Sequence, residues 1–266
     1  MSASSPETSL LGDPGDAEVI PATLRRDNAV AGLIHLVQAV AVVALATSFA
    51  LPVTASYLQG PPGTVAQDPV ELFEIPTGAA VAAFLALSAI AHGLVCTVWW
   101  RRYTVDLGRT RNPARWVEYS VSSSLMIVLI AQLTGISDIA ALVALFGVNA
   151  SMILFGWLQE HYEQPGGGGW LPFGFGCIAG TVPWLAIGIY LFSPGSTSSA
   201  SPPGFVYAIF VSLFVFFNIF ALNQWLQYRA RGRWASYVFG ERVYIVLSIT
   251  AKSALAWQIF AGTLAG

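Results

Sequence analysis

Charged residues are scarce in this sequence. Of 266 residues, 10% are charged and 55% are hydrophobic, whereas a soluble domain has about 25% charged residues. One water-soluble core of this size cannot bury so many apolar side chains, so the composition predicts a polytopic membrane protein. The net charge of −2 says nothing about nucleic acid, but the sequence has no basic stripe of the kind that binds it, so no nucleic-acid partner is expected.

Cysteines and catalytic motifs are scarce as well. Cys96 and Cys177 lie within apolar stretches and are interpreted as small buried residues. The sequence has no zinc-ligand cluster, nucleophile elbow or phosphate loop. We therefore predict no catalytic residue, no metal site and no enzymatic activity.

Seven apolar segments reach the length of about 20 residues that a membrane-spanning helix needs. They predict an all-α membrane protein, a seven-transmembrane helix bundle, within a domain of residues 25–266. Residues 1–24 are polar, acidic and rich in Ser, Pro and Gly, which predicts a disordered tail rather than a signal peptide. The segments are Asn28–Ala50, Pro76–Trp100, Arg115–Thr134, Ser137–Trp157, Leu171–Phe192, Gly204–Tyr228 and Tyr237–Leu264.

The first connection, residues 51–75, is the long one. It carries Gly60-Pro61-Pro62-Gly63 between Pro52–Leu58 and Pro69–Ile75. This pattern favours a β-hairpin outside the bilayer, with a plain irregular loop as the alternative. An exposed hairpin edge could pair with a second copy of the chain.

The arginines predict the orientation in the membrane. All eleven fall on one side of the predicted spans, and basic residues mark the cytoplasmic side. We expect a multi-pass cell-membrane protein in contact with lipid, with the N-terminus cytoplasmic and the C-terminus extracellular. The arginine-rich connections also offer a site for an acidic cytoplasmic partner, although they equally serve topology.

Lys252 is the only lysine in the chain, and it lies in the middle of the last apolar segment. A lysine at mid-membrane costs about 2.5–3.5 kcal/mol on insertion scales. A buried amine suits Schiff-base formation with an aldehyde ligand. A structural ion pair is the alternative interpretation.

A charged nitrogen at that depth needs an anion, and Glu118 in the third segment is the best candidate. Ser122 shares the helix face of Glu118, and Ser248 lies one turn before Lys252. Counted from the arginines near each helix start, Glu118 and Lys252 differ in depth by roughly 10 Å. We expect the lysine stem and helix tilt to close this gap, or Arg115 to lie inside the protein.

His35 and His92 lie at one predicted depth in the first two segments, in the cytoplasmic half. Together they suggest a polar cavity that accepts a proton. Hydrogen-bonded packing is the alternative.

Aromatic residues at helical spacing predict walls for a conjugated ligand, although such stripes are usually packing. On the sixth segment they are Phe210, Phe214 and Phe217, with Trp184 and Tyr119 at mid-helix elsewhere. Asn149, Met152 and Gly156 share a face of the fourth segment, where the glycine leaves room for a ring.

Seven helices with one lysine in the last resemble the microbial rhodopsins. Arg115-Trp116-Val117-Glu118-Tyr119 is similar to their third-helix pattern, in which the acid is the Schiff-base counterion. Three runs and the long first connection resemble one branch, the heliorhodopsins. The runs are Trp116–Ser120, Phe146–Glu160 and Ala251–Gln258.

This resemblance implies an all-trans retinal chromophore that isomerises to 13-cis, a slow photocycle and a homodimer joined partly by the first loop. It also implies that Glu118 and Ser248 hold the Schiff base, with His35 and His92 near a cytoplasmic cavity. The implied pocket residues are Tyr119, Ser123, Met126, Asn149, Met152, Gly156, Pro183, Trp184, Phe217 and Gln224.

Two positions depart from the pattern of the rhodopsin pumps. Ser248 and Leu129 stand where those pumps carry a second acid and a proton-donor carboxylate. The resemblance thus implies light sensing without ion pumping, read by a cytoplasmic signalling partner. A light-gated or light-driven ion conductor is the second hypothesis, and a membrane protein without a pigment is the third.

Overall fold

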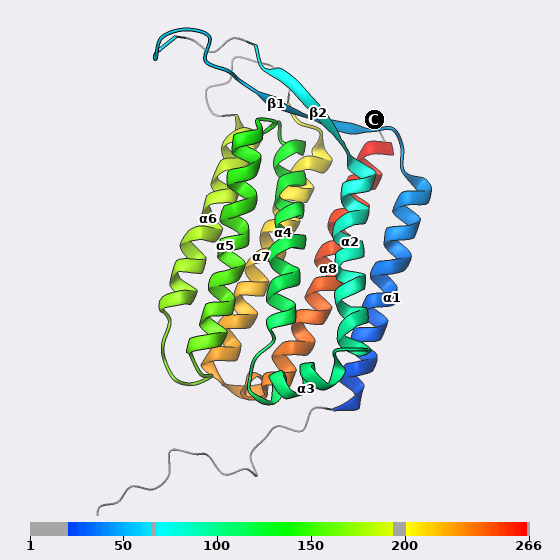
Figure 1. Ribbon diagram of the computed structural model, residues 1–266, viewed down its shortest axis with the longest axis vertical. Helices are drawn as coiled ribbons and strands as arrows, with labels where there is room; N and C mark the ends of the chain where they lie inside the picture. Colours follow the sequence, from blue (N-terminus) through cyan, green and yellow to red (C-terminus); the bar gives the residue numbers. More distant parts are fainter. Residues whose placement is uncertain (1–20, 65–67, 194–200, 265–266) are drawn as a thin grey trace, which may run out of the picture.

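The computed structural model describes residues 21–64, 68–193 and 201–264, mostly as long helices (Figure 1). The predicted tail falls largely on residues 1–20, outside the described part. In chain order the elements are α1 (Ala22–Leu45), β1 (Ala50–Ala55), β2 (Val70–Pro76), α2 (Thr77–Cys96), α3 (Trp100–Gly108), α4 (Pro113–Leu133), α5 (Ile139–Tyr162), α6 (Leu171–Phe192), α7 (Gly204–Arg229), the 3₁₀ turn η1 (Gly232–Ala235) and α8 (Tyr237–Leu264).

Within the described residues, seven helices are long and apolar enough to cross a membrane: all but α3. The seven-helix bundle is therefore confirmed, with shifted ends. α1 begins at Ala22, inside the stretch predicted as tail. It ends at Leu45 because the backbone is extended from Ala46, and Ala50 pairs in β1. The predicted second span ran on to Trp100, but α2 ends at Cys96, and Trp100 starts the separate helix α3.

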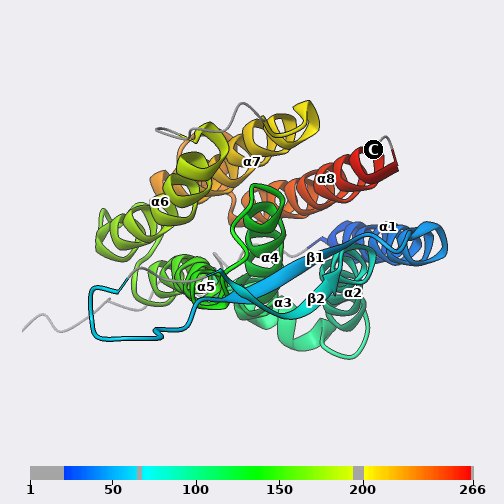
Figure 2. The ribbon, with the colours of Figure 1, turned by 90° about the horizontal axis from the view of Figure 1, so that it is seen from above.

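The first connection is a hairpin, as predicted, in which β1 and β2 pair antiparallel. It lies across one end of the bundle, here called the hairpin end (Figure 2). The Thr54 amide donates to the Ser137 carbonyl at 2.8 Å, and the two hydroxyl oxygens lie 3.0 Å apart. Ser137 precedes α5, so the hairpin is fastened to the α4–α5 turn. α3 lies at the opposite end, the α3 end.

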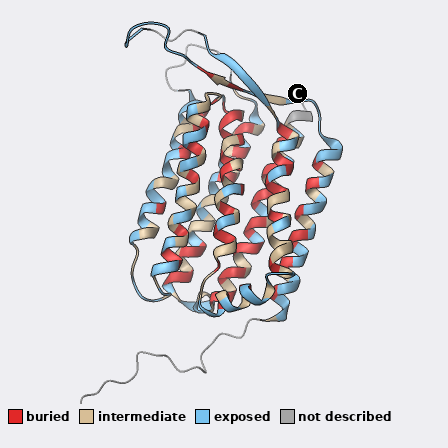
Figure 3. Ribbon diagram, viewed as in Figure 1, coloured by how far each residue is buried: buried red, intermediate tan, exposed pale blue. Residues whose placement is uncertain are grey.

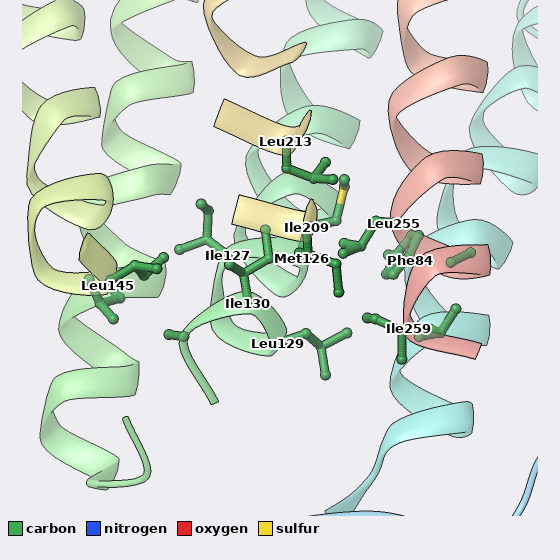
Figure 4. Close-up of a cluster of buried hydrophobic side chains, with 14 of the residues drawn as sticks. Phe84, Met126, Ile127, Leu129, Ile130, Leu145, Ile209, Leu213, Leu255 and Ile259 are labelled. Carbon is green, nitrogen blue, oxygen red and sulfur yellow. The ribbon is translucent and has the colours of Figure 1, made fainter. Parts of the chain in front are cut away.

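Buried residues concentrate along α4 and α8, while the outer helices expose apolar side chains (Figure 3). This distribution is expected where lipid, not water, faces the outside. A cluster of buried apolar side chains fills the bundle interior from several helices (Figure 4). Its members include Phe84, Met126, Ile127, Leu129, Ile130, Leu145, Ile209, Leu213, Leu255 and Ile259.

Candidate functional site

The centre of the bundle holds an ion pair between α8 and α4. The Nζ atom of Lys252 lies 2.6 Å from Oε1 of Glu118, and the two side chains are 5% and 8% exposed. The depth difference expected from the sequence is thus closed. Arg115 lies inside the protein, 7% exposed, rather than at its surface.

Two serines complete the hydrogen bonds of this pair. The ammonium of Lys252 donates to Ser88 Oγ at 2.5 Å and to Ser248 Oγ at 3.3 Å. Ser88 in turn donates to Glu118 Oε1 at 2.6 Å. A buried charge is tolerated when it is paired and hydrogen-bonded, and both conditions hold here.

Ser88 was not predicted as a site residue from the sequence. Its one available signal is its spacing of four residues from His92, which places both on one face of α2.

Lys252 also forms part of the wall of a cavity of about 500 Å³. This size lies within the range of about 300–1,000 Å³ that is typical of small-molecule pockets. Much of the wall is aromatic: the ring of Trp184 lies 5.4 Å from the rings of Phe214 and Phe217, centroid to centroid. An ion pair alone does not require such a space, so the cavity distinguishes this lysine from a purely structural one.

Two glycines keep the cavity open. A Cβ atom at Gly156 would lie 2.6 Å from Cζ3 of Trp116, and one at Gly180 would lie 2.6 Å from Sδ of Met152. Both distances are shorter than side-chain atoms tolerate, so any larger residue would push these neighbours into the cavity or away from it. The room predicted at Gly156 is present.

Most of the predicted pocket residues line this cavity. Three of the others stand just outside its wall: Ser248 beside the amine, Pro183 next to Trp184 within α6, and Asn149, which donates to Ser123 Oγ at 2.8 Å. The predicted residues in the wall are Tyr119, Ser122, Ser123, Met126, Met152, Gly156, Trp184, Phe217 and Gln224, together with Lys252 itself.

The two predicted histidines lie together between α1 and α2. Their rings stack with centroids 5.7 Å apart, and His92 Nδ1 lies 2.8 Å from Oδ1 of Asn28. His35 is fully buried, and neither of its ring nitrogens has a hydrogen-bond partner among the described residues. A buried polar atom left in this way is usually satisfied by water.

The residues present fit retinal. A primary amine lies at the wall of an apolar, aromatic cavity, and a carboxylate next to it can balance the positive charge of a Schiff base. Glu118 and Ser248, predicted to hold that nitrogen, both lie within hydrogen-bond distance of it.

Solved structures with the same fold are rhodopsins. A light-driven proton pump from Leptosphaeria maculans superposes with a TM-score of 0.64 at 13% identity, covering 93% of this chain and 98% of that one. The proton-pumping rhodopsin of the marine alga Acetabularia acetabulum gives 0.62 at 17% identity, covering 91% and 95%. The light-driven proton pump of Coccomyxa subellipsoidea gives 0.60 at 16% identity, covering 91% and 97%.

These identities are low enough that the likeness shows the fold alone. Among curated proteins, none matches the sequence. The sequence profile of the heliorhodopsins, in contrast, matches residues 24–264, nearly the whole described chain. This chain therefore belongs to the heliorhodopsin family and is a multi-pass membrane photoreceptor of the retinal-binding type.

Proposed function

We propose that retinal is attached to Lys252 as a protonated Schiff base, and that the protein senses light without pumping ions. The observation that carries this proposal is the position of the Lys252 amine, in the wall of the aromatic cavity and 2.6 Å from Glu118. Retinal in its all-trans form, when bound, supplies the absorption of visible light and a change of shape to 13-cis. The protein supplies the charge balance and the route for a proton.

Glu118 holds the positive charge at the nitrogen, and Ser88 and Ser248 fix the directions of its hydrogen bonds. Separating such a pair is costly because the site has a low dielectric constant. A proton that leaves the nitrogen therefore needs polar groups nearby. Ser248 leads toward the α3 end along α8, and the histidine pair with Asn28 lies between the neighbouring helices α1 and α2.

Toward the hairpin end, the interior next to the site is packed largely with apolar side chains. The apolar cluster on that side includes Leu129, at the position where rhodopsin pumps carry a proton donor (Figure 4). A pump needs access to its proton site from both membrane faces in turn. An apolar side chain at the donor position favours a sensor, whose slow photocycle would leave time for a partner to respond.

Ion transport is the second candidate, because the structural neighbours named above are described as proton pumps. Illuminated liposomes that contain the protein and retinal separate the two functions. We expect no sustained light-dependent current or pH change. A sustained current would refute the sensor and establish a conductor.

Flash-induced absorption spectra test the pigment itself. Wild-type protein with added retinal should show a visible band and a slow photocycle, whereas Lys252→Ala should show neither. A visible band with unchanged kinetics in Lys252→Ala would overturn the attachment site.

We further propose that the α3 end, with its arginines, faces the cytoplasm together with the N-terminus. There it would meet an acidic signalling partner. A homodimer formed partly through the hairpin fits the exposed side chains of Val70, Leu72 and Phe73 on β2. Mass measurement in detergent of wild type beside Phe73→Glu tests the dimer, which should dissociate in the variant.

A further inference from the structure

A second buried charge cluster lies at the α3 end, apart from Lys252 and Glu118. Arg115 of α4 donates through Nη2 to Oε2 of Glu160 on α5 at 2.5 Å. Through Nη1 it donates to Oε1 of Glu241 on α8. The Arg115 side chain is 5% exposed and each glutamate side chain is 1% exposed. Three helices are thus joined by one guanidinium.

The charges of this cluster do not balance. Two carboxylates share one guanidinium, and no other Lys or Arg in the described part of the chain forms an ion pair with either of them. An uncompensated charge is unfavourable in such a buried place. Two carboxyl groups that share a site commonly resolve this conflict by keeping one proton.

We propose that Glu160 and Glu241 together bind one proton, which makes this cluster a second proton-binding site of the protein. The proton comes from water and adds to one carboxylate oxygen, so Arg115 and the remaining carboxylate form a neutral pair. The site depends only on the chain's own residues, with or without retinal.

The hydrogen bonds around the cluster can accommodate that proton. The backbone N–H of Asn112 donates to Glu160 Oε1, and its side-chain Nδ2 donates to Glu241 Oε2 at 2.7 Å. The Tyr237 hydroxyl lies 2.9 Å from Glu160 Oε2, and because a hydroxyl can also accept, this contact can reverse when Glu160 is protonated.

Several buried polar atoms nearby have no hydrogen-bond partner among the described residues, including Nε of Arg115 and the hydroxyl of Tyr228. Tyr228 is 3% exposed, and buried polar atoms without a protein partner are usually satisfied by water.

Few other titratable groups face the cluster. Arg111 donates a hydrogen bond to the His161 carbonyl at 3.0 Å. Asp27 and Arg242, farther out, pair with each other at 3.3 Å. Burial raises the pKa of Tyr103 on α3 to about 12, so this phenol stays neutral. The other titratable groups around Arg115 and Glu160 include the phenols of Tyr119, Tyr228, Tyr237 and Tyr244.

The cluster also borders the cavity. The guanidinium carbon of Arg115 lies 4.0 Å from the ring centroid of Tyr244 and 4.5 Å from that of Trp116. Both rings form part of the cavity wall. Adding or removing the proton therefore changes the charge directly behind that wall.

Carbon-13 NMR of protein labelled at the glutamate side-chain carboxyl tests the proposal at neutral pH in the dark. Wild type should show a protonated glutamate carboxyl, whether or not retinal is bound. Glu160→Gln and Glu241→Gln should each abolish that signal completely, because either change leaves one carboxylate for one guanidinium.

Two matched variants assign the signal. Glu118→Gln should keep it, and so should Glu163→Gln, which removes a neighbouring glutamate outside the cluster. A wild-type spectrum without any protonated glutamate carboxyl overturns the proposal even if a variant fails to fold. A signal that disappears in Glu118→Gln and persists in the cluster variants overturns it as well.

Discussion

Lys252 Nζ and Glu118 Oε1 lie 2.6 Å apart although their residues sit at different heights along their helices. Glu118 is in the second turn of α4, and Lys252 is in the fifth turn of α8. Side chains on a helix lean toward its N-terminus, so the lysine stem reaches back toward the α3 end. The amine therefore contacts its carboxylate closer to the α3 end than the Cα atom of Lys252 lies.

Neutralising the carboxylate should shift the absorption of the pigment to the red. In Glu118→Gln the anion that stabilises the ground-state charge is lost, and the protein without retinal should lose about 3–5 kcal/mol of stability because a buried ammonium is left unpaired. Absorption spectra and thermal unfolding measure the two effects. Asp138→Asn, at the start of α5, is the control and should leave the absorption maximum unchanged. An unchanged spectrum in Glu118→Gln would mean that another residue is the counterion.

Replacing the lysine separates charge from covalent chemistry. Lys252→Arg keeps a cation beside Glu118, so we expect it to fold nearly as well as wild type, but a guanidinium forms no Schiff base. Lys252→Ala should lack both the pigment and the ion pair. Retinal titration followed by absorption, with unfolding curves of both variants, checks this; a visible band in Lys252→Arg would be incompatible with attachment at this residue.

Ser88 should influence the absorption of the pigment through its hydrogen bonds with Glu118 and Lys252. Ser88→Ala removes the donor to Glu118 Oε1 and one acceptor of the amine, so we expect a spectral shift and a loss of about 1–3 kcal/mol. Ser120→Ala is the matched control, because Ser120 is half-buried and its hydroxyl donates to Val117 within its own helix. Equal spectra for the two variants would contradict a role for Ser88.

Filling the space at Gly156 should hinder retinal uptake. Gly156→Ala brings a methyl group against the Trp116 ring, and the ring can yield only by moving within the crowded wall. We expect slower and less complete pigment formation, measured as the rise of the visible band after retinal is added. Gly147→Ala, on the same helix with open space around it, should form pigment at the wild-type rate.

Hydropathy predicted the spans because a bilayer requires long apolar helices with few exceptions. The scarcity of charge also made Lys252 and Glu118 stand out, since each is a rare ionisable group within an apolar segment. Ser88 did not stand out from the sequence in this way, because serine is common throughout the chain.

Glu160 was not recognised as buried for a related reason. It lies near the end of a span, where carboxylates normally face water, and only the fold brings Arg115 and Glu241 to it. The short helix α3 was missed because the arginines of that stretch are typical of a loop.

The hairpin has a mechanical consequence. Thr54 ties it to the α4–α5 turn, while its two ends continue from α1 and into α2. This tether restrains four helices at the same face of the membrane. Helix movements that follow light absorption should therefore be largest at the opposite face, where short turns and ion pairs, rather than a β-ladder, hold the helix ends together.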